Sequence, residues 1–466
     1  MVFSSITFLF YFLPAFLIFY FLLPWKNLTL LVFSLLFYGW GEPRFLPILI
    51  AYIIVNYAFG LLLNRESGRT DAILIGGLIA NFGLLLYFKY ANFLTEQMSW
   101  LAKHLGAGPL PVSHVILPLG ISFISFQGAS YLIDVYRGVV PPQRSLLKFA
   151  MYKSMFPQLI AGPIVRYSDI AADIDRRPTT LDNLFNGAQQ FMIGLGQKVL
   201  IANVVARPAD QIFSLGPSDL STGAAWLGIT CYTLQIYFDF AGYSNMAIGL
   251  GRVMGFTYPI NFDRPYASQS ITEFWRRWHI TLSRWFRDYL YIPLGGNRYG
   301  AFKTYSNLMV VFVLCGFWHG ASWTFLVWGI YHGTFLVIER LGLGSLLHKI
   351  WRPARHAYVI LAIMGGWVFF RSDSIHRAIS FFKALAGGGS SSMNFPFERF
   401  LSPSVEIAII FGAILSVAQI NRQSAEQTEE RWSLRTAGSM LVLAIFALSV
   451  LAISSGAYNP FIYYRF

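Results

Sequence analysis

The amino-acid sequence predicts an all-α polytopic membrane protein. Of its 466 residues, 55% are hydrophobic and only 12% are charged, whereas soluble domains carry roughly 25% charged residues. Apolar runs recur from end to end, close to the ~20 residues that a helix needs to cross a bilayer. A transmembrane β-barrel would instead show ~10-residue segments of alternating polarity. We expect about eleven transmembrane helices, with re-entrant and interfacial helices besides.

The net charge of +13 fits the same class. Lys and Arg collect in the cytoplasmic loops of membrane proteins and face anionic lipid, and no basic arm stands apart as a nucleic-acid site. We therefore expect membrane lipid as a partner and no nucleic acid. Both cysteines, Cys231 and Cys315, lie in apolar runs. They form no disulfide framework and no metal-ligand spacing, so we expect no metal.

The N-terminal part divides into apolar runs. Residues 3–23 form a first span, and 28–63 hold one or two more. These are interrupted near Pro43, which lacks a backbone donor and biases its predecessor away from helix. Residues 72–88 form another span, and the amphipathic stretch 93–105 is expected at a membrane interface.

The remaining runs differ in composition. Residues 115–135 are apolar but rich in Gly, Pro and Ser, which favours a broken or re-entrant helix buried in protein. We find no internal repeat, so a two-fold transporter architecture receives no support. Further spans are expected at 187–215, 221–256, 357–370, 404–420 and 437–454.

The segment that follows the span expected at 221–256 is the part of the sequence richest in Arg and Trp. Ser270 and Glu273 have the spacing of a capping box, which predicts a helix start. At ~100° per residue, one face of that helix collects aromatic residues and His279, and the other collects arginines. An amphipathic helix in the membrane interface is expected, and Pro293 with the following Gly-Gly pair ends it. The aromatic face is Trp275, Trp278, His279, Leu282, Trp285, Phe286 and Tyr289; the polar face is Arg276, Arg277, Arg284, Arg287 and Asp288.

Each charged feature of this helix has two interpretations. The arginines fit the positive-inside rule, but a guanidinium also binds phosphate through two parallel hydrogen bonds and could hold a phosphorylated donor. His279, at the edge of the aromatic face, is either a satisfied polar residue at a helix boundary or a functional group.

His319 lies in an apolar run with no charge from Val310 to Tyr331. An ionisable group inside a span is a functional candidate, and desolvation keeps a histidine neutral, as a general base requires. Gly316 and Gly320 flank it with G-x-x-x-G spacing, and small residues there permit either a close helix contact or room for a substrate. The alternative is a histidine hydrogen-bonded across two helices.

Two further ionisable residues lie in apolar runs. His332 is nearer the end of its run, where an interfacial histidine is the favoured interpretation. Asp239 needs a partner inside the protein, where it could orient a histidine or bind an arginine. A structural ion pair fits Asp239 equally well.

At these residues the sequence resembles the membrane-bound O-acyltransferase (MBOAT) family, in particular its bacterial branch typified by the alginate O-acetyltransferase membrane subunit. The segments that match include FPQLIAGPIVRYSD, YFDFAGYSNMAIGLG and GFWHGASWTFLVWGIYHG. All matching segments together cover much of residues 118–333, and the C-terminal residues 458–466 fit as well. They are 118–138, 156–169, 237–251, 261–298 and 316–333.

The resemblance implies a ring of tilted spans around a central tunnel. One integral membrane domain would fill residues 1–466, with N-terminal spans in 1–110, a catalytic core in 111–340 and C-terminal spans in 341–466. It also implies that His319 is the catalytic histidine and His279 the second family histidine. The donor would be cytosolic, here acetyl-CoA, with no bound cofactor. The location would be the bacterial inner membrane, with a separate SGNH-type acetyltransferase partner, periplasmic or membrane-anchored.

We therefore expect an O-acetyltransferase that passes acetyl groups across the membrane to an exported polysaccharide such as alginate. Peptidoglycan, cellulose or another exopolysaccharide is the alternative acceptor, and a non-catalytic polysaccharide or lipid export subunit is the alternative class. The residues expected to act are His319 and His279 in catalysis, Arg276, Arg277, Arg284, Trp278 and Asn297 in donor binding, and Asp239, Trp318 and Cys315 in support.

Overall fold

A computed structural model describes residues 2–63, 70–108, 110–390, 395–418 and 430–462, without the side chains of 430–435. All regular elements in this part of the chain are helices, as predicted. Five described helices are long and apolar enough to cross a membrane, so the count of eleven stays a prediction. These are Pro43–Leu62, Thr70–His104, Gly300–His319, Arg352–Arg371 and Thr436–Ser454.

The chain separates into two compact units. Unit 1 holds residues 1–187 and 250–259, and unit 2 holds 188–249 and 260–466. Two of the three points of division lie in long helices, α9 (Leu181–Gly196) and α11 (Thr222–Val253), and the third follows Pro259. The division into two units does not follow the subdivisions at residues 110 and 340 that we expect from the sequence. It also does not test whether residues 1–466 form one membrane domain, so that expectation stays a prediction.

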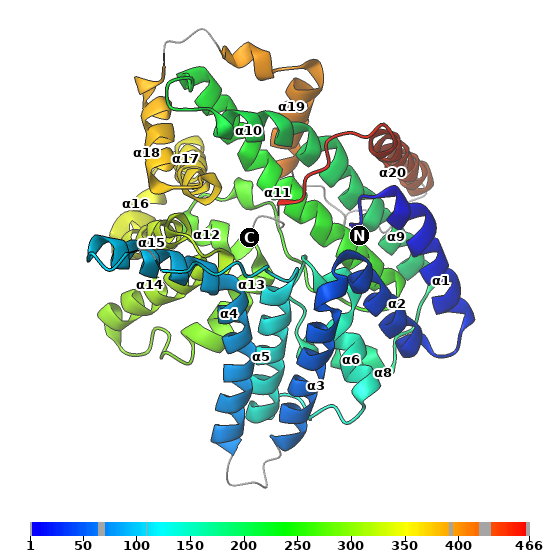
Figure 1. Ribbon diagram of the computed structural model, residues 1–466. Helices are drawn as coiled ribbons and strands as arrows, with labels where there is room; N and C mark the ends of the chain where they lie inside the picture. Colours follow the sequence, from blue (N-terminus) through cyan, green and yellow to red (C-terminus); the bar gives the residue numbers. More distant parts are fainter. Residues whose placement is uncertain (1, 64–69, 109, 391–394, 419–429, 463–466) are drawn as a thin grey trace. The chain divides into compact units, whose positions relative to one another are not determined.

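Unit 1 begins with helices packed through phenylalanine rings. The π-helix η1 (Thr7–Phe12) continues into α1 (Leu13–Leu22), and α2 (Lys26–Gly41) follows. Pro43 opens a short 3-10 turn, η2 (Pro43–Phe45), before α3 (Leu46–Leu62), so the predicted interruption is confirmed. Phe16 packs edge-on against Phe156 with ring centroids 5.1 Å apart. These helices are blue in Figure 1.

A single long helix replaces two predicted elements. α4 runs over Thr70–His104, so the separation of 72–88 from 93–105 was wrong. The second half of α4 contains polar side chains that are hydrogen-bonded to the segment after the helix. Asn92 Nδ2 donates to Val115 O at 2.9 Å, and Asn92 Oδ1 accepts from Val115 N at 2.8 Å. In Figure 1, α4 lies beside α5 (Ile121–Arg137), and α3 packs against both.

The helix in the Gly-rich run is shorter than its apolar stretch. Gly120 takes a left-handed conformation (φ 78°) immediately before α5 begins. Residues 115–120 are not helical, which fits the expected broken helix, whereas residues 121–135 form a regular helix. Unit 1 continues with α6 (Leu146–Ser154), α7 (Phe156–Leu159) and α8 (Tyr167–Asp175). Its last segment is tied to α1, because Tyr20 donates to Met254 O at 2.8 Å.

Unit 2 opens with two helical segments in backbone contact. α9 passes through the π-helix η3 (Gln197–Ala202) into α10 (Asn203–Ser214). A Cβ on Gly194 would lie 2.6 Å from Gly242 O of α11, so only glycine permits this approach. Beside it, buried Lys198 and Asp239 form an ion pair at 2.7 Å.

The Arg- and Trp-rich segment from Ser270 to Arg298, here called the central stretch, starts as predicted and then breaks. Ser270 Oγ accepts from Glu273 N at 3.0 Å, which confirms the helix start of α12 (Ile271–Arg277). His279 then takes a left-handed conformation (φ 43°), and a second helix, α13 (Ile280–Phe286), follows. The prediction of one continuous amphipathic helix was therefore wrong. A π-helix, η5 (Arg287–Tyr291), and turns through the Gly-Gly pair end the stretch.

Backbone pairing explains the break. Ile280 N donates to Asn261 O at 2.9 Å, and Asp263 N donates to Arg277 O at 3.0 Å. These bonds satisfy backbone groups that a continuous helix would have paired internally.

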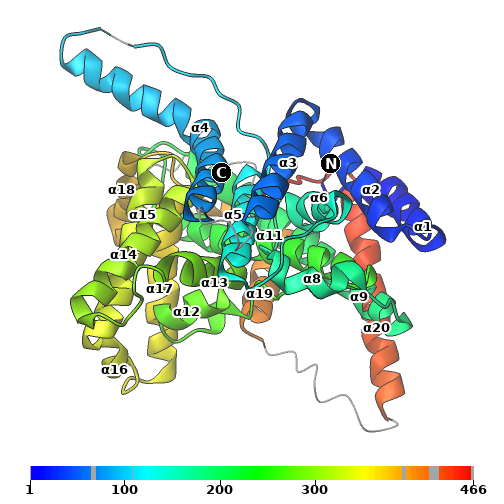
Figure 2. The ribbon, with the colours of Figure 1, turned by 90° about the horizontal axis from the view of Figure 1, so that it is seen from below.

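The apolar run around His319 is a helical hairpin. α14 (Gly300–His319) ends at the histidine, and α15 (Trp323–Ile338) begins after a short turn. Gly316 faces the carbonyl of Phe325, and Gly329 faces that of Phe312, too closely for a Cβ at either position. The close helix contact expected at Gly316 is confirmed. Figure 2 shows α14 and α15 side by side.

The remaining helices of unit 2 pack against different parts of it. α15 packs against α17, and α10 packs against α19. The elements not yet given are η4 (Pro265–Ala267), η6 (Glu339–Leu343), α16 (Gly344–Leu347), α17 (Arg352–Arg371), α18 (Ile375–Lys383), η7 (Ala384–Gly388), η8 (Phe397–Phe400), α19 (Pro403–Val417) and α20 (Glu430–Ser454).

Candidate active site

His279 lies at the break between α12 and α13. A left-handed conformation is uncommon for a residue other than glycine and persists where the surroundings hold it. Here Asn261 supplies the surroundings: its Oδ1 lies 3.0 Å from His279 Nδ1 and accepts from Thr281 Oγ1 at 2.9 Å. Its Nδ2 donates to Ser244 Oγ at 3.0 Å.

These contacts define which imidazole nitrogen carries the proton. Thr281 N also donates to Asn261 Oδ1, at 3.4 Å. Since a backbone N–H is only a donor, the Asn261 atom facing it is the oxygen. His279 Nδ1 must then donate, which leaves Nε2 with the lone pair. His279 Nε2 is buried and has no hydrogen-bond partner in the part of the chain described.

Burial also sets the charge of His279, which lies outside the five candidate spans. The side chain is only 2% exposed, and desolvation lowers its pKa to about 3. The imidazole is therefore neutral at physiological pH. A neutral ring with a free Nε2 lone pair can accept a hydrogen bond or a proton from a bound group.

His319 is held by aromatic rings at the end of α14. Its ring meets Trp328 and Phe370 edge-on, each with a centroid distance of 5.1 Å. Trp318 reaches both histidines, with its ring centroid 6.2 Å from His279 and 4.9 Å from His319. The break in the central stretch and the end of α14 thus bring the two predicted catalytic residues to one place within unit 2.

Both histidines line a cavity of about 240 Å³. A water molecule takes about 30 Å³ of liquid volume, so the cavity has room for a small acyl group and part of a donor chain. Cys315, Thr272 and Ser283 also face it. The histidines share a second, smaller space of about 20 Å³ with Phe240, Trp367 and Ile462.

Cationic side chains line the larger cavity as well. They are Arg276, Arg287 and Arg340. Arg287 pairs with Asp288 at 2.7 Å, whereas Arg276 and Arg340 form no ion pair with any described residue. The cavity therefore combines an apolar interior with unpaired positive charge, which suits a ligand that has an uncharged reactive end and anionic groups.

The other residues expected to bind the donor are distributed differently. Trp278 lines both cavities. Arg277 pairs with Glu273 at 2.8 Å and with Asp263 at 3.8 Å, and it lines neither of the two cavities. Arg284 and Asn297 are exposed and likewise do not line these two.

Asp239 holds the C-terminal segment rather than a histidine. Besides its pair with Lys198, its Oδ2 accepts from Ile462 N at 2.8 Å. Lys198 Nζ donates to Pro460 O. Of the roles left open for Asp239, the structure shows an ion pair with a lysine. Because Ile462 lines the smaller histidine cavity, this pair also positions one of its walls.

His332 differs from expectation. It is fully buried in α15, so its assignment as an interfacial histidine was wrong. Its ring meets Trp275 at 5.0 Å and Trp328 at 5.1 Å. A glycine at 366 leaves room for it, since a Cβ there would overlap the ring.

Two positioning residues were not singled out from the sequence. Asn261 orients His279, and Glu339 fixes the start of α12 by accepting from Ile271 N at 2.6 Å and Thr272 N at 2.9 Å. A carboxylate at a helix N-terminus is favourable. Asn261 is the first residue of a segment that carries the family resemblance, and this was the only indication of its importance in the sequence. Nothing in the sequence indicated a role for Glu339.

Comparison with known proteins places the site in a family context. Residues 140–362, which include both histidines, match the model of the membrane-bound O-acyltransferase family. The chain is 41% identical to the "Probable alginate O-acetylase" of Azotobacter vinelandii over the whole of both chains. It is 34% identical to the peptidoglycan O-acetyltransferase of Helicobacter pylori, covering all of this chain and 98% of the relative. A teichoic acid D-alanyltransferase of Bacillus subtilis is 27% identical, over 66% of this chain and 77% of the relative.

Proposed function

Because this chain belongs to the membrane-bound O-acyltransferase family and is thus a multi-pass membrane O-acyltransferase, we propose that it takes acetyl groups from cytosolic acetyl-CoA. It passes them across the bacterial inner membrane for O-acetylation of an exported polysaccharide. The observation that carries the proposal is that His279 and His319 line one cavity. Family membership removes the alternative of a non-catalytic export subunit.

In the proposed reaction His319 is the general base. A hydroxyl oxygen attacks the thioester carbonyl carbon, and His319 takes the hydroxyl proton. The C–S bond breaks, and the proton passes to the departing thiolate of coenzyme A. The hydroxyl belongs to the polysaccharide or to a partner's nucleophile.

His279 has a positioning role in this proposal. Its Nε2 lone pair is available because Nδ1 donates to Asn261. The proton of the attacking hydroxyl goes to His319, so from Nε2 His279 can accept a hydrogen bond from a second, neighbouring donor of the acceptor and so hold the attacking oxygen toward the carbonyl carbon. Its low pKa of about 3 keeps Nε2 unprotonated through the physiological pH range.

The donor is proposed to lie with its acetyl end between the histidines and its phosphates toward the arginines. Arg276 and Arg340 are the best supported contacts, since both line the cavity without an ion-pair partner among the described residues. Trp278 forms part of the same wall. Arg277, Arg284 and Asn297 remain proposals with less support, because they do not line that cavity.

The polymer and partner are also proposals. Alginate is the first choice of acceptor, since a relative named for alginate O-acetylation aligns over the full chain. Peptidoglycan is the second, because a peptidoglycan O-acetyltransferase also aligns over nearly its whole length. A separate SGNH-type acetyltransferase is proposed to receive the acetyl group outside the membrane.

The test compares ester content of exported polymers in cells carrying the wild-type protein, His319→Ala or His348→Ala at matched membrane levels. His348 lies outside both cavities and serves as the control. In cells with His319→Ala we expect one polymer to lose its esters, and that polymer is the acceptor. Cells with His348→Ala should keep the wild-type ester content. Unchanged ester content with His319→Ala would refute the proposal.

A further inference from the structure

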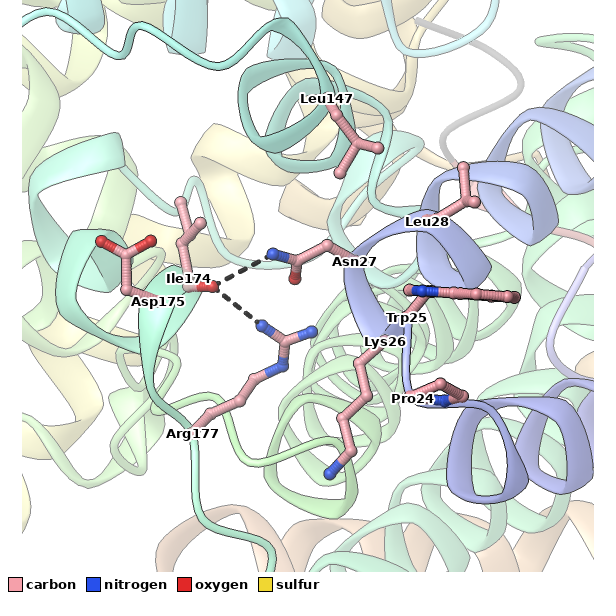
Figure 3. A pocket seen from close by; sticks show the side chains of 9 residues that line it. All are labelled: Pro24, Trp25, Lys26, Asn27, Leu28, Leu147, Ile174, Asp175 and Arg177. Atoms are coloured by element: carbon pink, nitrogen blue, oxygen red, sulfur yellow. Dashed lines mark hydrogen bonds between the residues drawn. The ribbon is translucent and has the colours of Figure 1, made fainter.

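A separate cavity lies in unit 1 where α1 joins α2. Its volume is about 440 Å³, larger than that of the histidine cavity. Figure 3 shows Trp25, Lys26 and Asn27 of the α1–α2 junction on one side of it, with Asp175 at the end of α8 and Arg177 just after that helix on the other. None of these residues has a part in the proposed acetyl transfer.

Two cations of this cavity lack a carboxylate partner. Lys26 Nζ contacts only aromatic rings within the described chain, 5.6 Å from the centroid of Tyr20 and 5.9 Å from that of Phe21. Arg177 donates to neutral oxygens, Tyr20 OH at 2.8 Å and Ile174 O at 3.2 Å. Both side chains therefore keep an uncompensated positive charge at the cavity.

The one acidic residue of the wall does not cancel this charge. Asp175 pairs with Lys148 at 2.6 Å, a lysine outside the lining. Lys26 and Arg177 thus leave the cavity net positive. An anionic ligand is favoured there by charge, and guanidinium and ammonium groups are the usual partners of phosphate.

Two polar atoms of the same wall also lack hydrogen-bond partners among the described residues. They are Asn27 Oδ1 and Arg177 Nη2. Asn27 Nδ2 is already used, because it donates to Ile174 O at 3.2 Å (Figure 3). Since buried polar groups are nearly always hydrogen-bonded, an unmet acceptor and an unmet donor indicate a place where a polar group binds.

The surroundings indicate the source of the anion. Trp25 is 65% exposed and stands next to Lys26, and Trp and Lys are typical anchors at a membrane–water interface. α1, which leads to the cavity, exposes Ile18, Phe19 and Leu22. The acyl chains of a lipid can pack along this apolar face, whereas a soluble anion has no apolar chain that would contact it.

We propose that this cavity binds the head-group phosphate of a glycerophospholipid, held by Lys26 and Arg177, with the acyl chains along α1. A head-group hydroxyl or ammonium would donate to Asn27 Oδ1. The site is independent of the acetyl-transfer proposal, since it uses no residue of the histidine cavity.

The test measures retention of phosphatidylglycerol by the purified, detergent-solubilised protein in native mass spectrometry. Because one basic residue near an anionic lipid surface contributes about 1 kcal/mol, Lys26→Ala should weaken binding by about fivefold. Lys26→Arg should retain it. Lys103→Ala, an exposed lysine of α4, is the matched control and should bind as the wild type does. Equal binding in Lys26→Ala and wild type, or equal loss in Lys103→Ala, would overturn the proposal.

Competition distinguishes the two sources of phosphate. Diacylglycerol, which has the same acyl chains without phosphate, should not displace the phospholipid. Displacement by equimolar inorganic phosphate or coenzyme A would assign the cavity to a soluble anion and overturn the lipid assignment. Arg177→Lys adds a second variant that keeps the charge but loses the planar group, and it should also weaken retention.

Discussion

Replacing Asn261 by alanine tests how His279 is oriented. The change removes the acceptor of His279 Nδ1 at 3.0 Å and of Thr281 Oγ1 at 2.9 Å. A buried donor left without its partner costs about 1–3 kcal/mol. The imidazole can avoid this cost by moving its proton to Nε2, and Nε2 then no longer accepts a hydrogen bond from the acceptor. Either outcome misplaces the group that aims the hydroxyl.

The expected size of the effect follows from that cost. Since about 1.4 kcal/mol corresponds to a factor of ten, the rate of acetyl transfer should fall by roughly 10- to 100-fold. The assay is release of free thiol from acetyl-CoA by the purified enzyme with acceptor. Ser244→Ala, which removes only the bond from Asn261 Nδ2 at 3.0 Å, should have a smaller effect. Wild-type rates in Asn261→Ala would refute the assigned orientation.

Asn261→Asp separates orientation from charge. It keeps an oxygen facing His279 but adds a negative charge, which raises the pKa of the imidazole above its value of about 3. His279 then becomes protonated as the pH falls through the raised value, and the Nε2 lone pair is lost. The variant should therefore lose activity at a higher pH than the wild type does. Identical pH profiles for the two proteins would contradict the proposed role of the lone pair.

Three further outcomes are expected. Gly316→Val places side-chain atoms against the carbonyl of Phe325 and should greatly reduce the yield of monodisperse protein in size-exclusion chromatography, while an unchanged yield would contradict the close α14–α15 contact. Asp239→Asn leaves Lys198 buried without its partner, which costs about 3–5 kcal/mol; we expect a lower thermal transition and faster cleavage of the tail by carboxypeptidase, and wild-type values for both would speak against the tail anchor. His279 has a folded-state pKa of about 3, below the ordinary histidine value of 6.5, so its contribution to stability is complete above pH 6.5 and declines as the pH falls toward 3. Removing that histidine should flatten the fall in thermal stability between these pH values, and an unchanged slope would count against a buried neutral ring.

The sequence was most informative where local chemistry decides the structure. Ser270 and Glu273 predicted the start of α12, and Pro43 predicted the interruption before α3, because capping and the missing proline donor act within a few residues. The resemblance and the charge-free run around His319 identified the two histidines that the structure brings together.

The sequence was least informative where distant backbone decides the structure. Nothing in residues 271–286 forbids a continuous helix, and the break at His279 depends on the backbone hydrogen bond that Asn261 O accepts and the one that Asp263 N donates. α4 stays continuous because Asn92 is satisfied by Val115. The partner of Asp239, forty-one positions away in the chain, likewise could not be read from a local pattern.

A double-mutant cycle on His279 and His319 tests the central claim most directly. Thiol release from acetyl-CoA would be measured for purified wild-type enzyme, His279→Ala, His319→Ala and the double variant. Residues that act as a unit give strongly non-additive effects, so we predict that the double variant is about as impaired as His319→Ala alone. If the fold-losses of the two single variants multiply in the double variant, the histidines act independently, and the account of one shared site is contradicted.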